Sequence, residues 1–271
     1  MALDRNGIPF HPSEYDPDFP RVKCIMCGLM NSCTHDFSSG TEPWYPRLPI
    51  LLEGGMVESI EESNIFFHEY TLWSLEKIRD ADIAHHKLLI KDFIHPELLK
   101  QLLDTWPTEM PEDEDVPGRF FHNIDSLPAY TILNDTVFGN WYVQCALVDK
   151  FNLKVEYQST QFWLWKDTEV FTVNDVHVDY TDFEMTFGLY LPGSEQIEEY
   201  GTQFWKPLID VSETWDNDQS ISRDDCEFID QAPFTNGTCY FMPRTMHSWH
   251  SSPVIDKKMD RKHVYGFYKT V

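Results

Sequence analysis

From about residue 155 onward, the chain is a succession of short runs rich in aromatic and β-branched residues, and this pattern constrains the fold most. The runs read EYQSTQFWLWK, DVHVDY, EMTFGLYLP, GTQFWKP, GTCYFMP, SWHSSPVI and RKHVYGFYKTV, and each is bounded by Pro, Gly, Asn or Asp. Short strands separated by such turn residues are typical of an antiparallel sandwich or barrel. An acidic insert at 209–228 interrupts the series.

The first half of the chain favours helices instead. Residues 65–80 carry helical spacing, and 87–107 predicts a short strand, a turn and a helix with Pro96 in its first turn. Residues 108–118 predict an acidic loop, and 135–152 predict a second helix. We therefore expect an α+β, mainly β protein with a loop-rich segment and a helix over 1–84. Its β domain, over 85–271, should house any chemistry.

The net charge of the chain limits the classes of partner that it can bind. Lys and Arg number 21 against 45 Asp and Glu, a net charge of −24, which argues against nucleic acid or an anionic membrane surface as the main partner. No secretory signal and no apolar run long enough to span a membrane are visible. We expect a soluble, cytoplasmic protein; the sequence leaves its oligomeric state open.

The stretch DVHVDY contains a candidate metal-binding pair. Residues i and i+2 of a strand face the same side, so His177 and Asp179 can reach one point. One further histidine would complete the two-histidine, one-carboxylate triad that binds Fe(II). His247 and His250 are both available for that position, and the residues alone leave the choice between them open.

Three downstream features extend this pair into a longer pattern: GTQF at 201–204, SWH at 248–250, and Arg261 at the start of the last run. With these in order after HVD, the chain resembles the Fe(II)- and 2-oxoglutarate-dependent dioxygenases, especially their prolyl-hydroxylase-like branch, over roughly residues 85–271. The resemblance implies a double-stranded β-helix core of the jelly-roll or cupin type with N-terminal flanking helices.

The resemblance also implies roles for individual residues. His177, Asp179 and His250 would bind Fe(II), leaving three coordination positions for 2-oxoglutarate and the cosubstrate O₂. Arg261 would hold the distal carboxylate of 2-oxoglutarate, since a guanidinium fork suits a carboxylate. Phe267 would lie beside the metal.

One position departs from the family pattern. Many relatives place a small hydroxyl two residues after the arginine to help bind the cosubstrate, and here that position is His263. We expect Tyr190 or Thr186 to supply the hydroxyl instead. Lys262 competes with Arg261 for the carboxylate, but it points to the opposite face if Phe267 faces inward.

The expected reaction is hydroxylation of a C–H bond in a peptidyl residue or a free amino acid, with release of succinate and CO₂. The carboxylate of Asp179 argues against halogenation, because halogenating relatives carry a small residue there. Two other interpretations stay open: a cupin-type metalloprotein such as an isomerase, and a non-catalytic double-stranded β-helix binding module.

A separate cluster lies near the N-terminus, where CIMCGLMNSCTH provides Cys24, Cys27, Cys33 and His35. Thiolates and one imidazole suit tetrahedral zinc, and a loop-rich segment would gain order from binding it. The alternative is that these cysteines are buried small residues or reduced surface thiols. A structural zinc site is therefore a hypothesis for this segment.

Overall fold

A computed structural model of the chain describes residues 69–153, 159–171, 175–179, 183–211 and 220–269, with four two-residue strands nearer the N-terminus. The chain divides into two compact units. The first comprises residues 1–80 and 136–156, and the second comprises 81–135 and 157–271. The two-residue strands form two antiparallel pairs, β1 (Ala2–Leu3) with β2 (Pro9–Phe10) and β3 (Val22–Lys23) with β4 (Leu51–Leu52).

In the first unit two helices pack against each other, α2 (Glu69–Asp80) and α5 (Trp141–Lys150). Lys150 Nζ donates a hydrogen bond to the Arg79 carbonyl at 3.0 Å, across 71 residues of sequence. Both helices lie inside the ranges for which the sequence predicted helix. No helix among the described residues has the length and apolar character needed to cross a membrane.

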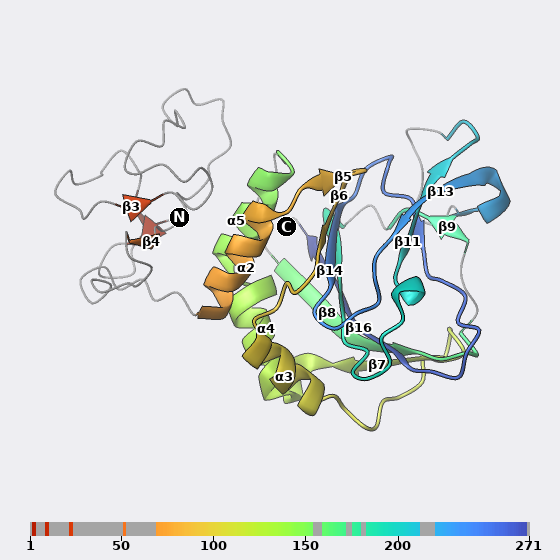
Figure 1. Cartoon of the computed structure of the whole chain (residues 1–271), viewed down its shortest axis with the longest axis horizontal. Helices are drawn as coiled ribbons and strands as arrows, with labels where there is room; N and C mark the ends of the chain where they lie inside the picture. The colour runs from red at the N-terminus through yellow and green to blue at the C-terminus, as the bar shows by residue number, and fades with distance from the viewer. Residues whose placement is uncertain are drawn as a thin grey trace. The chain divides into compact units, whose positions relative to one another are not determined.

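The second unit contains a seven-stranded antiparallel sheet in the order β5-β6-β14-β10-β16-β8-β7 (Figure 1). Its strands are β5 (Ile83–Ala84), β6 (Lys87–Ile90), β7 (Arg119–Asn123), β8 (Ser159–Asp167), β10 (Met185–Tyr190), β14 (Cys239–Pro243) and β16 (Arg261–Lys269). Every residue of β10 is buried, which fits its central place and its continuous apolar sequence.

A second, five-stranded sheet has the order β12-β9-β15-β11-β13. Its strands are β9 (Val176–His177), β11 (Gln203–Pro207), β12 (Ser220–Ile221), β13 (Cys226–Gln231) and β15 (His250–Ser251). From β8 to β16 the chain crosses repeatedly between the two sheets, with β11, β12 and β13 following one another in the small sheet, and this is the winding of a double-stranded β-helix. The predicted fold, mainly β around this core, is confirmed.

The core of this unit lies between the two sheets. Tyr190 and Tyr240 of the large sheet share one buried cluster with Phe204 of the small sheet. Gly188 lies beneath the Tyr240 ring, and a Cβ there would come within 2.3 Å of a ring carbon. The aromatic side chains that define the strand pattern therefore fill the interior, close to the polar groups described below.

Short helical elements occur along the chain between the longer helices and the strands. They are α3 (Pro96–Asp104), η3 (Ile124–Ser126), α4 (Pro128–Leu133), a π-helical η4 (Asn134–Phe138), η5 (Glu198–Tyr200) and η6 (Arg223–Asp225). Pro96 begins α3 as predicted, and the His95 side chain caps it by accepting from the Glu97 backbone N–H. The prediction omitted α4, β7 and β13. The last is an edge strand whose charged residues read as part of the acidic insert.

Candidate metal centre

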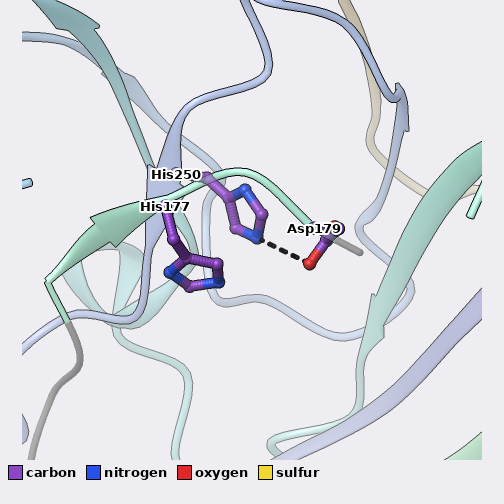
Figure 2. Close-up of side chains that lie close together, drawn as sticks. All are labelled: His177, Asp179 and His250. Carbon is purple, nitrogen blue, oxygen red and sulfur yellow. Dashed lines mark ion pairs between the residues drawn. The ribbon is translucent and has the colours of Figure 1, made fainter. Parts of the chain in front are cut away.

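Two neighbouring strands of the small sheet bring three potential metal ligands together. His177 on β9 and His250 on β15 are paired in register, and Asp179 follows β9 two residues later. One ligand atom from each residue lies within 4.8 Å of the other two (Figure 2). These are the three predicted ligands, and they form the one such group of His, Cys, Asp or Glu among the described residues.

Backbone carbonyl groups fix which nitrogen of each imidazole faces the centre. Nδ1 of His177 lies 3.1 Å from the Asp175 carbonyl, and Nδ1 of His250 lies 3.0 Å from the Ser248 carbonyl. A carbonyl can only accept, so each Nδ1 carries the proton and each Nε2 keeps a free lone pair. A hydrogen bond from Nδ1 to a backbone carbonyl is common for metal-binding histidines, because it sets the tautomer and the ring orientation.

The Asp179 carboxylate is held from two sides. The Thr186 hydroxyl donates to Oδ2, and the Tyr265 hydroxyl lies 3.4 Å from Oδ1. Burial and the charge of Asp179 raise the pKa of Tyr265, so this phenol stays a protonated donor. Arg244 also donates to the Asp179 backbone carbonyl at 2.9 Å. The carboxylate is therefore oriented before any ion binds.

The electrostatics of the three groups suit a divalent cation. Burial, followed by the neighbouring His250, lowers the pKa of His177, so that its imidazole stays neutral at physiological pH. Nε2 of His250 lies 3.6 Å from Asp179 Oδ1, the ion pair drawn in Figure 2. Two imidazoles and a carboxylate are the donor set that mid-row divalent metals prefer, and their spacing lets one ion contact all three.

His247, the competing third ligand, lies outside this group. Its exposed ring stacks on His86 with centroids 4.4 Å apart, and burial followed by the charge of His247 lowers the pKa of His86. His250 is 6% exposed and lies with the two other ligands. The geometry therefore agrees with the choice of His250.

Arg261 is buried at the start of β16, as a carboxylate-binding residue requires, but described residues already engage it. Its Nε donates to the Tyr200 carbonyl at 2.7 Å, Nη1 donates to Asp167 at 2.8 Å, and Nη2 lies 3.4 Å from Thr202 Oγ1. The Tyr190 hydroxyl also bonds Thr202, at 2.9 Å. Tyr190 therefore lies beside Arg261, and Thr202 links the two.

The other predicted residues are Thr186, Phe267 and His263, and each has a different environment. Thr186 bonds Asp179, so it acts on a ligand. Phe267 pairs with Thr186 across the strands and stacks on Phe183, with ring centroids 3.7 Å apart. His263 is fully buried, and burial, followed by Arg261, lowers its pKa to about 3. A neutral imidazole therefore occupies this position, which the sequence had already identified as a departure from the family pattern.

Sequence reasoning missed four residues around this centre: Arg119, Asp167, Thr202 and Tyr265. Tyr265 lies on the same strand face as Arg261 and Phe267, so the i, i+2 rule could have found it. Asp167 directly follows the predicted run EYQSTQFWLWK, and Thr202 belongs to the GTQF element. Arg119 had no signal, because its strand was not predicted.

The hypothetical zinc ligands Cys24, Cys27, Cys33 and His35 lie outside the described residues. The other three cysteines are free thiols in the structure, buried at Cys145 and Cys239 and partly exposed at Cys226.

Among known proteins, this chain is similar to solved structures but matches no protein family by sequence. No protein-family model matches the chain, and no curated protein matches it. A 2OG-Fe(II) oxygenase family oxidoreductase from Burkholderia pseudomallei is similar with a TM-score of 0.45 and 14% identity, covering 76% of this chain and 93% of that one. A prolyl-4-hydroxylase from Pseudomonas putida is similar with a TM-score of 0.45 and 11% identity, covering 69% and 94%.

A third similar structure is the non-heme alpha ketoglutarate dependent epimerase SnoN from nogalamycin biosynthesis, with a TM-score of 0.44 and 10% identity, covering 73% of this chain and 79% of that one. The solved structures that this chain resembles thus include 2OG-Fe(II) oxygenases. At such identities and TM-scores, the activity of this chain has to be argued from its own residues.

Proposed function

We propose that this protein is an Fe(II)- and 2-oxoglutarate-dependent oxygenase that hydroxylates a C–H bond and releases succinate and CO₂. The observation that carries the proposal is the metal centre: His177, Asp179 and His250 converge in the interior of a double-stranded β-helix, and a backbone carbonyl lies beside Nδ1 of each imidazole. When bound, Fe(II) supplies O₂ activation coupled to the oxidative decarboxylation of 2-oxoglutarate.

A metal ion held by only three protein ligands would keep coordination positions for the cosubstrates 2-oxoglutarate and O₂. Facial coordination by two histidines and one carboxylate leaves three positions of an octahedron open, which suits a bidentate 2-oxo acid and O₂. The Asp179 carboxylate fills the position that a halide would need, and this supports hydroxylation over halogenation. The stacked rings of Phe183 and Phe267, next to Thr186, provide an apolar wall that limits water access.

The buried guanidinium of Arg261 supports 2-oxoglutarate as the cosubstrate. An arginine carries five N–H donors, and three of those on Arg261 are engaged by described residues. In this proposal, Arg261 N–H donors outside these three contacts bind the distal carboxylate. A guanidinium also keeps its charge at every physiological pH, whereas a buried lysine can lose it.

For the oxidised substrate we propose a peptidyl residue or a free amino acid. The net charge of −24 favours neutral or cationic substrates over nucleic acid. Exposed Asp175 lies two residues before His177 and adds to the negative potential beside the centre.

The proposal is tested by following 2-oxoglutarate consumption and succinate formation in the Fe(II)-loaded protein under air, with and without candidate peptides and amino acids. We expect slow succinate formation without substrate and a faster rate with the correct one. His177→Ala should abolish both rates. The matched control is His247→Ala, an exposed histidine outside the metal centre, which should keep them.

The product must also be identified, because 2-oxoglutarate chemistry also serves an epimerase among the similar structures. A mass increase of about 16 Da in the substrate would support hydroxylation. An unchanged mass with an inverted stereocentre would show that the reaction is an epimerisation and not a hydroxylation. Fe(II)-loaded protein that never forms succinate above the His177→Ala background would contradict the proposal.

A further inference from the structure

Three charged side chains lie in a row across three adjacent strands of the large sheet, and we call them the Arg–Asp–Arg cluster. Arg119 on β7, Asp167 on β8 and Arg261 on β16 are aligned in register. Their exposed fractions are 9%, 0% and 2%. Charged residues are rarely buried to this degree without a specific reason.

The carboxylate of Asp167 joins the two arginines. Oδ1 accepts from Arg119 Nε at 2.8 Å, and Oδ2 accepts from Arg261 Nη1 at 2.8 Å and from Arg119 Nη2 at 3.3 Å. Burial would raise the pKa of Asp167, but the charges of Arg119 and Arg261 and the hydrogen bond from Arg119 outweigh it and lower that pKa. Asp167 is therefore ionised at physiological pH.

The charges of the cluster do not cancel. Two guanidinium groups and one carboxylate leave one positive charge, and His263 adds none because its pKa is lowered to about 3. Within the described part of the chain, Asp167 is the single carboxylate that forms an ion pair with either arginine. An uncompensated buried charge costs several kcal/mol, and a bound anion would remove that cost.

The arginines are also held rigidly. The Arg119 guanidinium lies between the rings of Trp165 and Phe171, 4.0 and 4.3 Å from their centroids. Arg261 is fixed by Asp167, by the Tyr200 carbonyl and by Thr202. Donors fixed in advance lose little conformational entropy when they bind a ligand.

Aromatic contacts connect the cluster to the metal centre. The ring of Trp165 that contacts Arg119 stacks on Tyr265 with centroids 4.2 Å apart, and the Tyr265 hydroxyl reaches Asp179. The excess positive charge is thus placed on the same interior as the metal ligands.

We propose that Arg119 and Asp167 are positioning residues that set the carboxylate site of Arg261 to a net charge of +1, matched to one carboxylate of a 2-oxo dicarboxylic acid. Asp167 orients Arg261 and cancels one charge, and Arg119 restores the excess charge that attracts the anion. The inference rests on the proposed function, since it assumes that the other end of the acid binds the metal.

The test compares three proteins that differ in the charge of the cluster: wild type (+1), Arg119→Met (0) and Arg119→Met/Asp167→Asn (+1). Calorimetry on the full-length, Mn(II)-loaded proteins measures the affinity for 2-oxoglutarate and for 2-oxopentanoate, which has a methyl group in place of the distal carboxylate. We expect Arg119→Met to weaken 2-oxoglutarate binding at least about tenfold, or about 1.4 kcal/mol, and to leave 2-oxopentanoate binding unchanged. The double variant should return to within about threefold of wild type.

Each outcome decides a separate question. Equal 2-oxoglutarate affinity in Arg119→Met and wild type would overturn the role of Arg119, and a folded double variant without recovery would overturn the charge count. Wild-type protein that binds Mn(II) but no 2-oxoglutarate would contradict the proposed function instead. Should Arg119→Met fail to fold, Arg119→Lys, which keeps the charge, against Arg119→Gln makes the same comparison, with Lys expected to bind more tightly.

Discussion

The metal centre and the Arg–Asp–Arg cluster are both buried polar groups in the same β unit, but the chain assembles them differently. Two of the metal ligands lie two residues apart, and the third is on the neighbouring strand of the small sheet. The cluster draws Arg119, Asp167 and Arg261 from three strands separated by 48 and 94 residues of sequence. A local motif supplies two of the three metal ligands, whereas each member of the Arg–Asp–Arg cluster comes from a different strand.

If two of the three ligands come from one local motif, metal affinity should depend strongly on each ligand and little on an exposed histidine such as His247. His250→Ala should lower the affinity for Fe(II) or Co(II) by more than about 1,000-fold, well beyond the 10- to 100-fold typical of losing an outer-shell partner. Competition with a metallochromic chelator measures this. His247→Ala is the matched control and should bind metal as wild type does; a comparable loss in that variant would make His247 a ligand.

The cluster, in contrast, should contribute to folding. Asp167→Asn leaves two buried guanidinium groups without their counter-charge and should lower the free energy of unfolding by about 3–5 kcal/mol in denaturant titrations. Asp104→Asn, which removes an exposed ion pair with Lys100, should change it by less than about 0.5 kcal/mol. A loss below about 1 kcal/mol for Asp167→Asn would contradict the account of the cluster.

The stability provided by Asp167 should depend on pH in a defined direction. Its folded-state pKa is lowered, so its contribution is present above the unfolded value of about 3.9 and is lost as the pH falls through the folded value. The difference between wild type and Asp167→Asn should therefore shrink below about pH 4.

His263 should produce a pH effect at higher pH. Its folded pKa of about 3 lies below the unfolded value of about 6.5, so only the unfolded chain binds this proton in between. The free energy of unfolding should therefore fall by up to about 1.4 kcal/mol per pH unit as the pH drops from about 6 to about 4. His263→Asn should remove this part of the slope, measured on metal-free protein; an unchanged slope would mean that His263 is protonated in the fold.

The smallest expected effect concerns the hydroxyl that holds Asp179. Thr186→Val removes the hydrogen bond to Oδ2 at nearly constant volume and should weaken metal binding about tenfold. Thr186→Ser keeps the hydroxyl and should bind as wild type does. Equal affinity in the Val and Ser variants would show that Tyr265 and Arg244 suffice to orient Asp179.

The strand half of the fold was predictable because its signals are local. Turn residues bound each aromatic run, and β8, β10, β11, β14 and β16 all fall within the predicted runs. The strands β7 and β13 were missed although β7 contains two phenylalanines between Gly118 and Asn123. The first follows an acidic loop, and the second lies at a sheet edge with its charged side chains exposed.

The difference between sequence motifs and cross-strand register also explains which site residues were predicted and which were missed. His177, Asp179 and His250 were predicted because spacing and order carry the information. Asp167 and Arg119 were missed because their roles arise only from cross-strand register, which a single sequence does not encode locally. The hydroxyl beside Arg261 was expected from Tyr190 or Thr186, whereas Thr202 is the hydroxyl that Arg261 and Tyr190 share.

The central claim is that His177, Asp179 and His250 hold Fe(II) with room for a chelating 2-oxo acid. It is tested most directly by adding Fe(II) and then 2-oxoglutarate to the protein under anaerobic conditions and recording the visible spectrum. We predict a weak charge-transfer band that saturates with 2-oxoglutarate, is absent from His177→Ala, and is retained in His247→Ala. A protein that binds Fe(II) but develops no band at saturating 2-oxoglutarate would contradict the claim.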